Sequence, residues 1–155
     1  MKRFGLFRID DLCYAIPIGE LRKILSDPRI YRLPQLPKGI PAVLVDSEEM
    51  VPVLDLQLLL DSEKVQPWTD RNLYQVLADS EYGTIALSAE KSGRVVTEAK
   101  GELSQPAADH EPWVTAEFAY QGEVYKVFDI DSLAMEMTKD FCRDPAESGD
   151  TRRYE

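Results

Sequence analysis

Short runs in which apolar residues alternate with other residues are the feature that most constrains the fold of this chain. Residues 12–18 read LCYAIPI, so that every second side chain is a large apolar one. This period of two predicts a β-strand with one face on a core. Similar strand-like runs are expected at 4–9, 29–33, 42–45, 50–54, 73–78, 84–89, 94–97, 113–120 and 124–130. So many short strands predict an all-β protein made of two small barrels, in preference to one open sheet.

Helical signals are few. Leu21, Ile24 and Leu25 have helical spacing, which predicts one or two helical turns over 19–25 before Asp27-Pro28 ends them. A helical turn is expected at 56–60, and a C-terminal helix is expected to begin near residue 131.

Turn residues and composition divide the chain. The sequence predicts a first barrel over residues 1–62, a linker over 63–71, a second barrel with the C-terminal helix over 72–142, and a flexible tail over 143–155. A two-residue hairpin turn is expected at 10–11, and an acidic hairpin loop is expected at 46–49. The stretch 101–112 is polar and is expected to be a surface loop.

A weak internal repeat supports two similar barrels. Residues 51–59 and 125–133 each read as a strand that ends in an aspartate, Asp55 or Asp129, followed by a turn that carries leucine. The carboxylate of an aspartate at such a junction can accept hydrogen bonds from the amides of the first helical turn.

Charge excludes one class of partner. The 155 residues include 18 Lys and Arg against 28 Asp and Glu, a net charge of −10. Binding to nucleic acid through phosphate neutralisation needs clustered basic residues, so nucleic acid is not expected as a partner. No apolar run approaches the roughly 18–20 residues that span a bilayer. With Cys13 and Cys142 too few and too far apart for a disulfide framework or a zinc site, a cytoplasmic protein is expected.

Candidate catalytic groups are sparse. Asp129 and Asp131 could hold a divalent cation, although capping of the helix is the simpler interpretation. The only histidine, His110, lies in a polar loop, and the carboxylates of 46–49 lie at an exposed hairpin tip that would not raise a carboxyl pKa for acid catalysis. We therefore expect no enzyme activity, no metal and no cofactor, and an acid-dependent hydrolase is the disfavoured alternative.

Several segments, taken in order, carry a resemblance to a known family. They are 14–18 with Leu21 and Ile24, then 29–34, 38–40, 51–56, 85–87, 94–96, 118–123 and 127–133. Over residues 3–137 the chain resembles the CheW-like family, the coupling proteins of bacterial chemotaxis.

The resemblance implies two five-stranded, SH3-like barrels that meet at a hydrophobic junction, with no catalytic activity. The first strand, 3–9, is allowed to join the second barrel. The implied partners are the cytoplasmic tip of a chemoreceptor and the regulatory domain of a chemotaxis-type histidine kinase, which is itself CheW-like and pairs barrel end to barrel end. The function expected is therefore that of an adaptor, and the alternative is an interaction or ligand-binding double barrel outside chemotaxis.

The resemblance also implies partner-binding residues. Ile18 and Leu21 fall where the family presents apolar residues to a partner, and Ile24 falls beside them. A place in the core is the open alternative for all three. Burial of one such side chain at an interface is worth roughly 1.5–3 kcal/mol.

Two departures from the family pattern change the sign of a charge. Lys23 stands where members often carry Glu, and the turn that contains Ser47 and Glu48 replaces an Asn-Leu-Arg-Gly turn. We expect Lys23, Ser47 and Glu48 to belong to the partner-binding surface. A receptor surface shaped to meet arginine would meet carboxylates there, which is a repulsive change.

Overall fold

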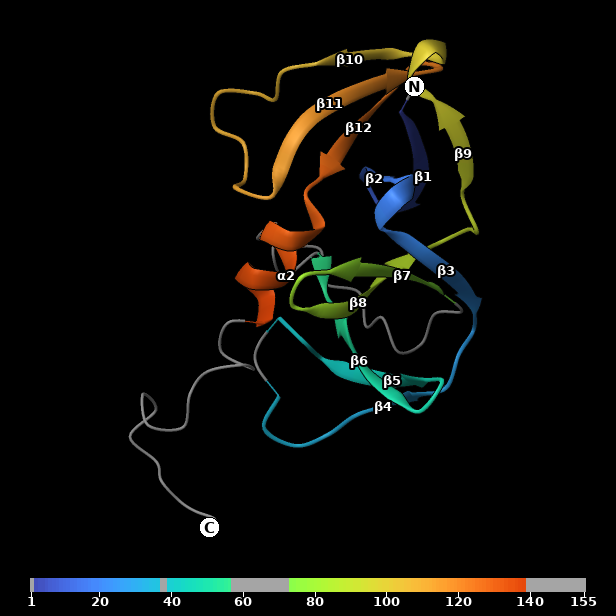
Figure 1. Ribbon diagram of the computed structural model, residues 1–155, viewed down its shortest axis with the longest axis vertical. Coiled ribbons are helices and arrows are strands. Elements are labelled where there is room, and N and C mark those ends of the chain that lie inside the picture. Colours follow the sequence, from blue (N-terminus) through green and yellow to red (C-terminus); the bar gives the residue numbers. More distant parts are fainter. Residues whose placement is uncertain (1, 37–38, 57–72, 139–155) are drawn as a thin grey trace.

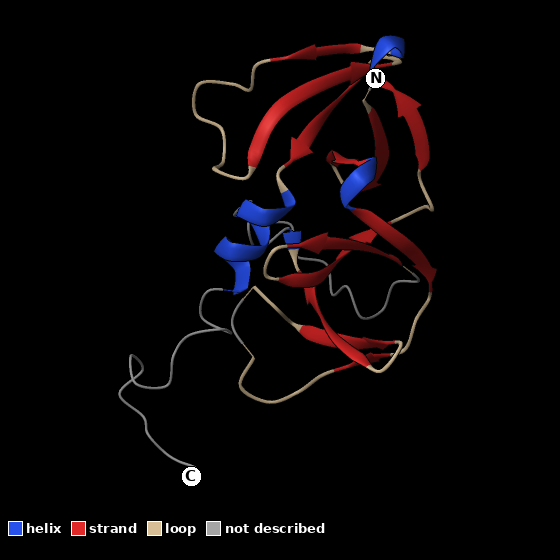
Figure 2. Ribbon diagram, viewed as in Figure 1, coloured by secondary structure: helices blue, strands red, loops and turns tan. Residues whose placement is uncertain are grey.

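The computed structural model describes residues 2–36, 39–56 and 73–138, which form two β-sheets of six strands each (Figure 1). Figure 2 shows that strands dominate and that helix is confined to short turns and one segment late in the chain. The prediction of an all-β protein is confirmed. Among the described residues, none of the helices is long and apolar enough to cross a membrane.

The first sheet is in the upper half of Figure 1. Its strands are β1 (Arg3–Ile9), β2 (Leu12–Pro17), β9 (Arg94–Thr97), β10 (Glu102–Ser104), β11 (Val114–Tyr120) and β12 (Glu123–Phe128). They lie in the order β10-β11-β12-β2-β1-β9. Neighbouring strands are antiparallel, except that β12 and β2 run parallel.

The second sheet lies below the first (Figure 1). Its strands are β3 (Leu21–Ser26), β4 (Ile30–Tyr31), β5 (Ala42–Asp46), β6 (Glu49–Leu54), β7 (Tyr74–Ser80) and β8 (Gly83–Ala89). They lie in the order β3-β7-β8-β6-β5-β4, and among these described strands only β6 and β8 form a parallel pair. This architecture is the expected one of two SH3-like barrels.

Sheet membership does not follow the order of the chain. The strand β1 joins the later strands, as the resemblance allows, but β2 goes with it, while β7 and β8 join the sheet of the earlier strands. The division expected from the sequence places β2 in a barrel of residues 1–62 and places β7 and β8 in a barrel of residues 72–142. In the structure each of these strands lies in the other sheet. The reason is physical: the two parallel pairs are long-range contacts, and a local period of two says nothing about which strand lies next to which.

The predicted hairpins are confirmed at both turns. Ile9 pairs with Leu12 across the 10–11 turn, where Asp10 has φ 52°. In the second hairpin Asp46 pairs with Glu49, and Ser47 and Glu48 between them both have positive φ, 51° and 68°. Two consecutive positive φ values are typical of the tight turns that match the twist of the strands.

The helical turns predicted over 19–25 are wrong for most of that segment. Only a 3₁₀ turn, η1 (Ile18–Glu20), is present there, and β3 follows it directly. The register of β3 against β7 shifts between Leu21 and Lys23, which makes Arg22 the extra residue of a β-bulge. The bulge lets Leu21 and Ile24 contact the same core although they are three residues apart, and this spacing imitates a helix.

The C-terminal helix expected near residue 131 is present as α2 (Ile130–Thr138). Three other sequence-based expectations fall outside the described residues. They are most of the helical turn at 56–60, the linker at 63–71 and the tail at 143–155.

Three apolar clusters hold the molecule together. Two fill the barrels: one of them contains Phe4, Leu6 and Phe118, and the other contains Leu44, Val53 and Leu77. The largest cluster lies at the junction, where it combines residues of β1 and β2 with residues of β7, β8 and α2. Its large buried members include Tyr14, Ile16, Ile40, Leu54, Val76, Ile85, Leu87, Trp113, Phe128, Ile130 and Leu133.

Tyr14 connects the two sheets directly. Its ring stacks on Phe128 at a centroid distance of 5.1 Å, and its hydroxyl donates to the carbonyl oxygen of Ser88 in the second sheet at 2.9 Å. Burial raises the pKa of the Tyr14 phenol far above its usual value. The phenol therefore stays neutral and serves as a hydrogen-bond donor in the junction.

Candidate partner-binding surface

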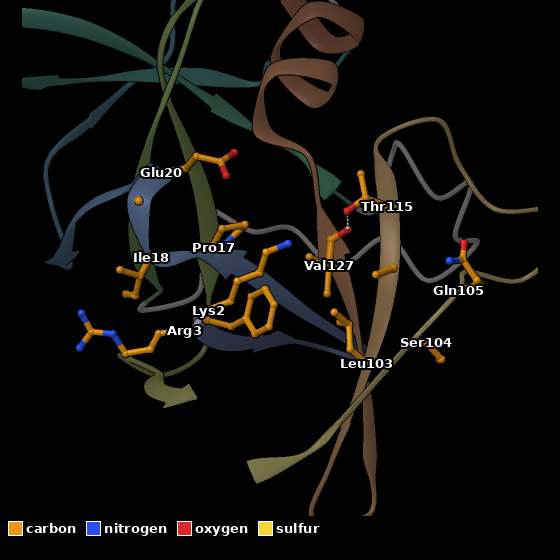
Figure 3. A pocket seen from close by; sticks show the side chains of 13 residues that line it. Lys2, Arg3, Pro17, Ile18, Glu20, Leu103, Ser104, Gln105, Thr115 and Val127 are labelled. Carbon is orange, nitrogen blue, oxygen red and sulfur yellow. Dashed lines mark hydrogen bonds between the residues drawn. The ribbon is translucent and has the colours of Figure 1, made fainter. Parts of the chain in front are cut away.

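A pocket of about 810 Å³ opens beside η1, between the beginning of β1 and the strands β10 to β12 (Figure 3). Figure 3 shows Ile18 and Arg3 on one side of this space, with Leu103 and Val127 on the other. The lining residues are Lys2, Arg3, Phe4, Pro17, Ile18, Gly19, Glu20, Leu103, Ser104, Gln105, Thr115, Ala116 and Val127. Both apolar and polar side chains thus line this pocket.

The charged groups of this pocket differ in how they are paired. Lys2 and Arg3 are exposed and form no side-chain hydrogen bond or ion pair within the described part of the chain. The carboxylate of Glu20 instead accepts a hydrogen bond from the amide of Ile130, the first residue of α2, at 3.3 Å. Burial raises the pKa of Glu20, and the neighbouring carboxylates raise it further, against the effect of that hydrogen bond. The pocket therefore offers accessible cations at its rim.

The three apolar residues predicted to meet a partner lie in different environments. Ile18 is half-buried and lines the pocket, where its side chain is accessible to another molecule. Leu21 and Ile24 are also half-buried, but both pack against the junction core and pair with Ala78 and Val76 in β7. The structure thus separates Ile18 from the other two, which contribute to the core.

Lys23 lies beside the predicted turn and is joined to it by an ion pair. Its Nζ is 3.0 Å from Oδ1 of Asp46, whose side chain is only 11% exposed. Its neighbour Arg22 reaches Glu49, the residue that pairs with Asp46 across the hairpin, with Nη1 2.9 Å from Oε1 of Glu49, and it also donates to Oγ1 of Thr84 at 2.9 Å. The bulge presents two successive basic side chains to the acidic hairpin.

Apolar side chains flank the turn residues Ser47 and Glu48, which are themselves exposed. Val45 and Met50 pair directly across β5 and β6 and are 51% and 55% exposed. The two side chains together form a small exposed apolar area next to the charged turn.

Sequence reasoning missed several members of this surface. It did not identify Arg22 or the pairing of Asp46, because the bulge that orients Arg22 leaves no local pattern. It also missed β10, which carries Leu103, because all three residues of that strand are exposed and show no alternation. It did not identify Lys2 and Arg3, which lie just before and at the beginning of the first strand and follow no binding pattern.

The groups considered for catalysis or metal binding serve the fold. Asp129 Oδ2 accepts from the Ser132 hydroxyl at 2.8 Å, and Asp131 Oδ1 accepts from the amide of Glu81 at 2.8 Å. His110 is exposed, with its Nδ1 2.8 Å from the Glu111 carbonyl oxygen. Across residues 2–36, 39–56 and 73–138, no group of three or more His, Cys, Asp or Glu is placed to hold a metal ion.

The two sheets and their shared core define a double-barrel β-protein of the SH3-like type. The family model described as CheW-like domain matches residues 3–137, nearly all of the barrels, and the chain belongs to this family. The fold is also that of the crystal structure of the scaffolding protein TtCheW from Thermoanaerobacter tengcongensis, with a TM-score of 0.70, 14% identity, and coverage of 85% of this chain and 91% of that one. A comparison with curated proteins finds no match. Family membership supports a general role as a non-catalytic adaptor of the chemotaxis type.

Proposed function

We propose that this protein is a non-enzymatic adaptor that couples a chemotaxis-type histidine kinase to a chemoreceptor or a related sensory partner. The observation that carries the proposal is the match to the CheW-like domain over residues 3–137, which includes both barrels and their junction. Such an adaptor works by binding two proteins at once, so that it needs two surfaces and no reacting group.

The proposed kinase surface lies at the β5–β6 hairpin, at the end of the barrel that the second sheet forms. It consists of Lys23, the turn Ser47-Glu48, and the exposed pair Val45 and Met50. The apolar pair supplies area to bury, while the turn supplies charges that select the partner and orient it. Lys23 pairs with Asp46, so the charge of Asp46 is matched within the protein. The carboxylate of the exposed Glu48 is therefore the group of this turn that we assign to the contact with the kinase domain.

The pocket beside η1 is the proposed receptor surface. Ile18 contributes apolar area at its rim, and Lys2 and Arg3 add positive charge. Apolar area beside exposed basic residues is suited to an amphipathic helix that carries carboxylates on one edge. This assignment leaves Leu21 and Ile24 a supporting role behind the surface.

A capture experiment tests the proposal. The immobilised protein is offered the regulatory domain of the kinase and, separately, the cytoplasmic tip of the receptor from the same genome. We expect the wild type to retain both, Ile18→Asp to lose the receptor while it keeps the kinase, and Glu48→Lys to weaken kinase capture at least tenfold.

Val124→Asp is the matched control, because Val124 is 54% exposed and lies outside both surfaces. It should behave like the wild type. Retention of neither partner by the wild type would exclude the adaptor role and favour an interaction module outside chemotaxis. Equal loss on Val124→Asp and Ile18→Asp would exclude the assigned surfaces.

A further inference from the structure

A second groove, of about 580 Å³, lies at the other end of β1 and shares no lining residue with the pocket beside η1. The end of β1, the loop between β8 and β9, and one residue of β12 form its walls. Its lining residues are Leu6, Phe7, Arg8, Glu90, Lys91, Ser92, Gly93, Arg94 and Tyr125. We call this the β9 groove.

The β9 groove is basic although the protein as a whole is acidic. Arg8, Lys91 and Arg94 line it, against the single carboxylate of Glu90. That carboxylate accepts a hydrogen bond from the backbone amide of Asp10 at 2.7 Å. The groove therefore presents an excess of positive charge on a chain whose net charge is −10.

Two of these cations are available to a ligand. Arg8 donates from Nε to the carbonyl oxygen of Asp10 at 3.1 Å and has Nη1 3.6 Å from Oε1 of Glu123. Lys91 and Arg94, in contrast, form no hydrogen bond or ion pair with any residue that the structure describes. Unpaired cations in a groove attract carboxylates and can form charge-assisted hydrogen bonds with them.

The wall that carries these cations is held in place. The amide of Glu90 donates to the carbonyl oxygen of Arg8 at 2.8 Å, which ties the loop to β1. Gly93 has φ +77°, and a Cβ there would lie 2.6 Å from the Leu6 carbonyl oxygen, so the loop packs closely on the strand. A site that is already ordered loses less entropy when a ligand binds.

The strand beside the groove offers a second mode of contact. β9 lies at the edge of its sheet and pairs, among the described residues, only with β1 (Figure 1). Val95, next to Arg94, is 55% exposed. An edge strand with an exposed apolar side chain accepts extended peptides by strand addition.

We propose that the β9 groove binds an extended acidic segment of a partner protein, in which carboxylates that meet Lys91 and Arg94 alternate with apolar residues. The surface is a third one, separate from those assigned to the kinase and the receptor. A long polyanion such as nucleic acid fits less well, because the remaining surface of this chain would repel it.

The test is fluorescence anisotropy with a labelled peptide of about eight residues in which valine and glutamate alternate, a length that spans an edge strand. We expect the wild type to bind this peptide and the combined change Lys91→Glu with Arg94→Glu to weaken binding at least tenfold. Binding should also weaken as salt is added, since the attraction is between charges. Arg29→Glu, at an exposed position before β4, is the matched control and should bind like the wild type.

A peptide with lysine in place of glutamate is expected not to bind. Equal binding of the two peptides would exclude charge recognition and overturn the proposal. Full competition by millimolar inorganic phosphate would indicate a small-anion site, and tighter binding of labelled single-stranded DNA would indicate a nucleic-acid site. Absence of peptide binding to the wild type, or unchanged binding to the doubly changed variant with its fold intact by circular dichroism, would also refute it.

Discussion

Nζ of Lys23 lies 3.0 Å from Oδ1 of Asp46, and this pair joins two strands that stand far apart in the order of their sheet. β3 is one edge of that sheet, and β5 lies next to the other edge, so the pair crosses the seam at which the sheet closes into a barrel. Both departures from the family pattern, the basic residue in β3 and the acidic turn, therefore meet in one interaction. The repulsion that this acidic turn would exert on an acidic partner is reduced at Asp46, because the charge of Asp46 is matched within the protein.

Reversal of the charge of Lys23 should weaken the contact between β3 and β5. Asp46 and Glu49 are like charges directly opposite each other, a destabilising arrangement unless cations lie close to both. Lys23→Glu would add a third carboxylate, and we expect the free energy of unfolding to fall by about 1–2 kcal/mol. Urea unfolding followed by circular dichroism measures this change.

The exchanged pair provides the control. Lys23→Glu combined with Asp46→Lys should recover at least half of the lost stability, because the ion pair is restored with its signs reversed. Arg29→Glu, which breaks no ion pair among the described residues, should change stability by less than about 0.5 kcal/mol. If the double variant is no more stable than Lys23→Glu alone, the two residues do not interact in solution.

Gly93 should tolerate no side chain. Its φ of +77° disfavours other residues, and a Cβ would lie 2.6 Å from the Leu6 carbonyl oxygen and 2.5 Å from a ring carbon of Phe7. Gly93→Ala should therefore destabilise the protein by about 2 kcal/mol or more, measured as a shift in the urea midpoint. Gly19→Ala is the comparison, since no atom of the described residues lies within 4 Å of its added Cβ. Similar midpoints for the two variants would contradict the close approach of the loop to β1.

Much of the local structure could be predicted from the sequence. Strands such as β2 and β8 have alternating or continuous apolar patterns, and the turns at 10–11 and 47–48 join strands of matching period. The partners of those strands could not be predicted, because β12 and β2 meet only after more than a hundred residues of intervening chain. Of the site residues, Ile18 was recognised through a resemblance, whereas the role of Arg22 depends on a bulge that no local pattern reveals.

The polar pair in the second barrel should couple energetically. Gln75 is fully buried; its Nε2 donates to Oγ of Ser88 at 2.9 Å, while its Oε1 has no hydrogen-bond partner among the described residues. Ser88→Ala should lower the free energy of unfolding by about 1–3 kcal/mol, because it leaves both Nε2 and Oε1 of the buried Gln75 without a hydrogen-bond partner. Adding Gln75→Leu to Ser88→Ala should restore most of that stability, since both polar groups are then gone. Thermal unfolding of Ser88→Ala, of Gln75→Leu and of the double variant checks this, and additive losses would contradict it.

Glu20 should make stability depend on pH. Burial raises its folded-state pKa above the ordinary value of 4.5, so the folded protein holds this proton more tightly than the unfolded chain does. Its contribution to stability is then fully present below pH 4.5 and is lost as the pH rises through the folded-state pKa. Glu20→Gln, which keeps an oxygen to accept from Ile130, should therefore gain stability relative to the wild type as the pH rises above 4.5. Urea unfolding of both proteins from below pH 4.5 upward measures the difference, and a constant or opposite trend would contradict the partly buried setting of Glu20.

Simultaneous binding is the most direct test of the central claim, that one double barrel holds two proteins on separate surfaces. Sedimentation velocity of the protein mixed with the kinase regulatory domain and the receptor cytoplasmic tip measures whether all three travel together. We expect one boundary that contains all three chains, and loss of only the receptor from it when Ile18→Asp replaces the wild type. Two separate binary boundaries, in which each partner displaces the other, would contradict the account.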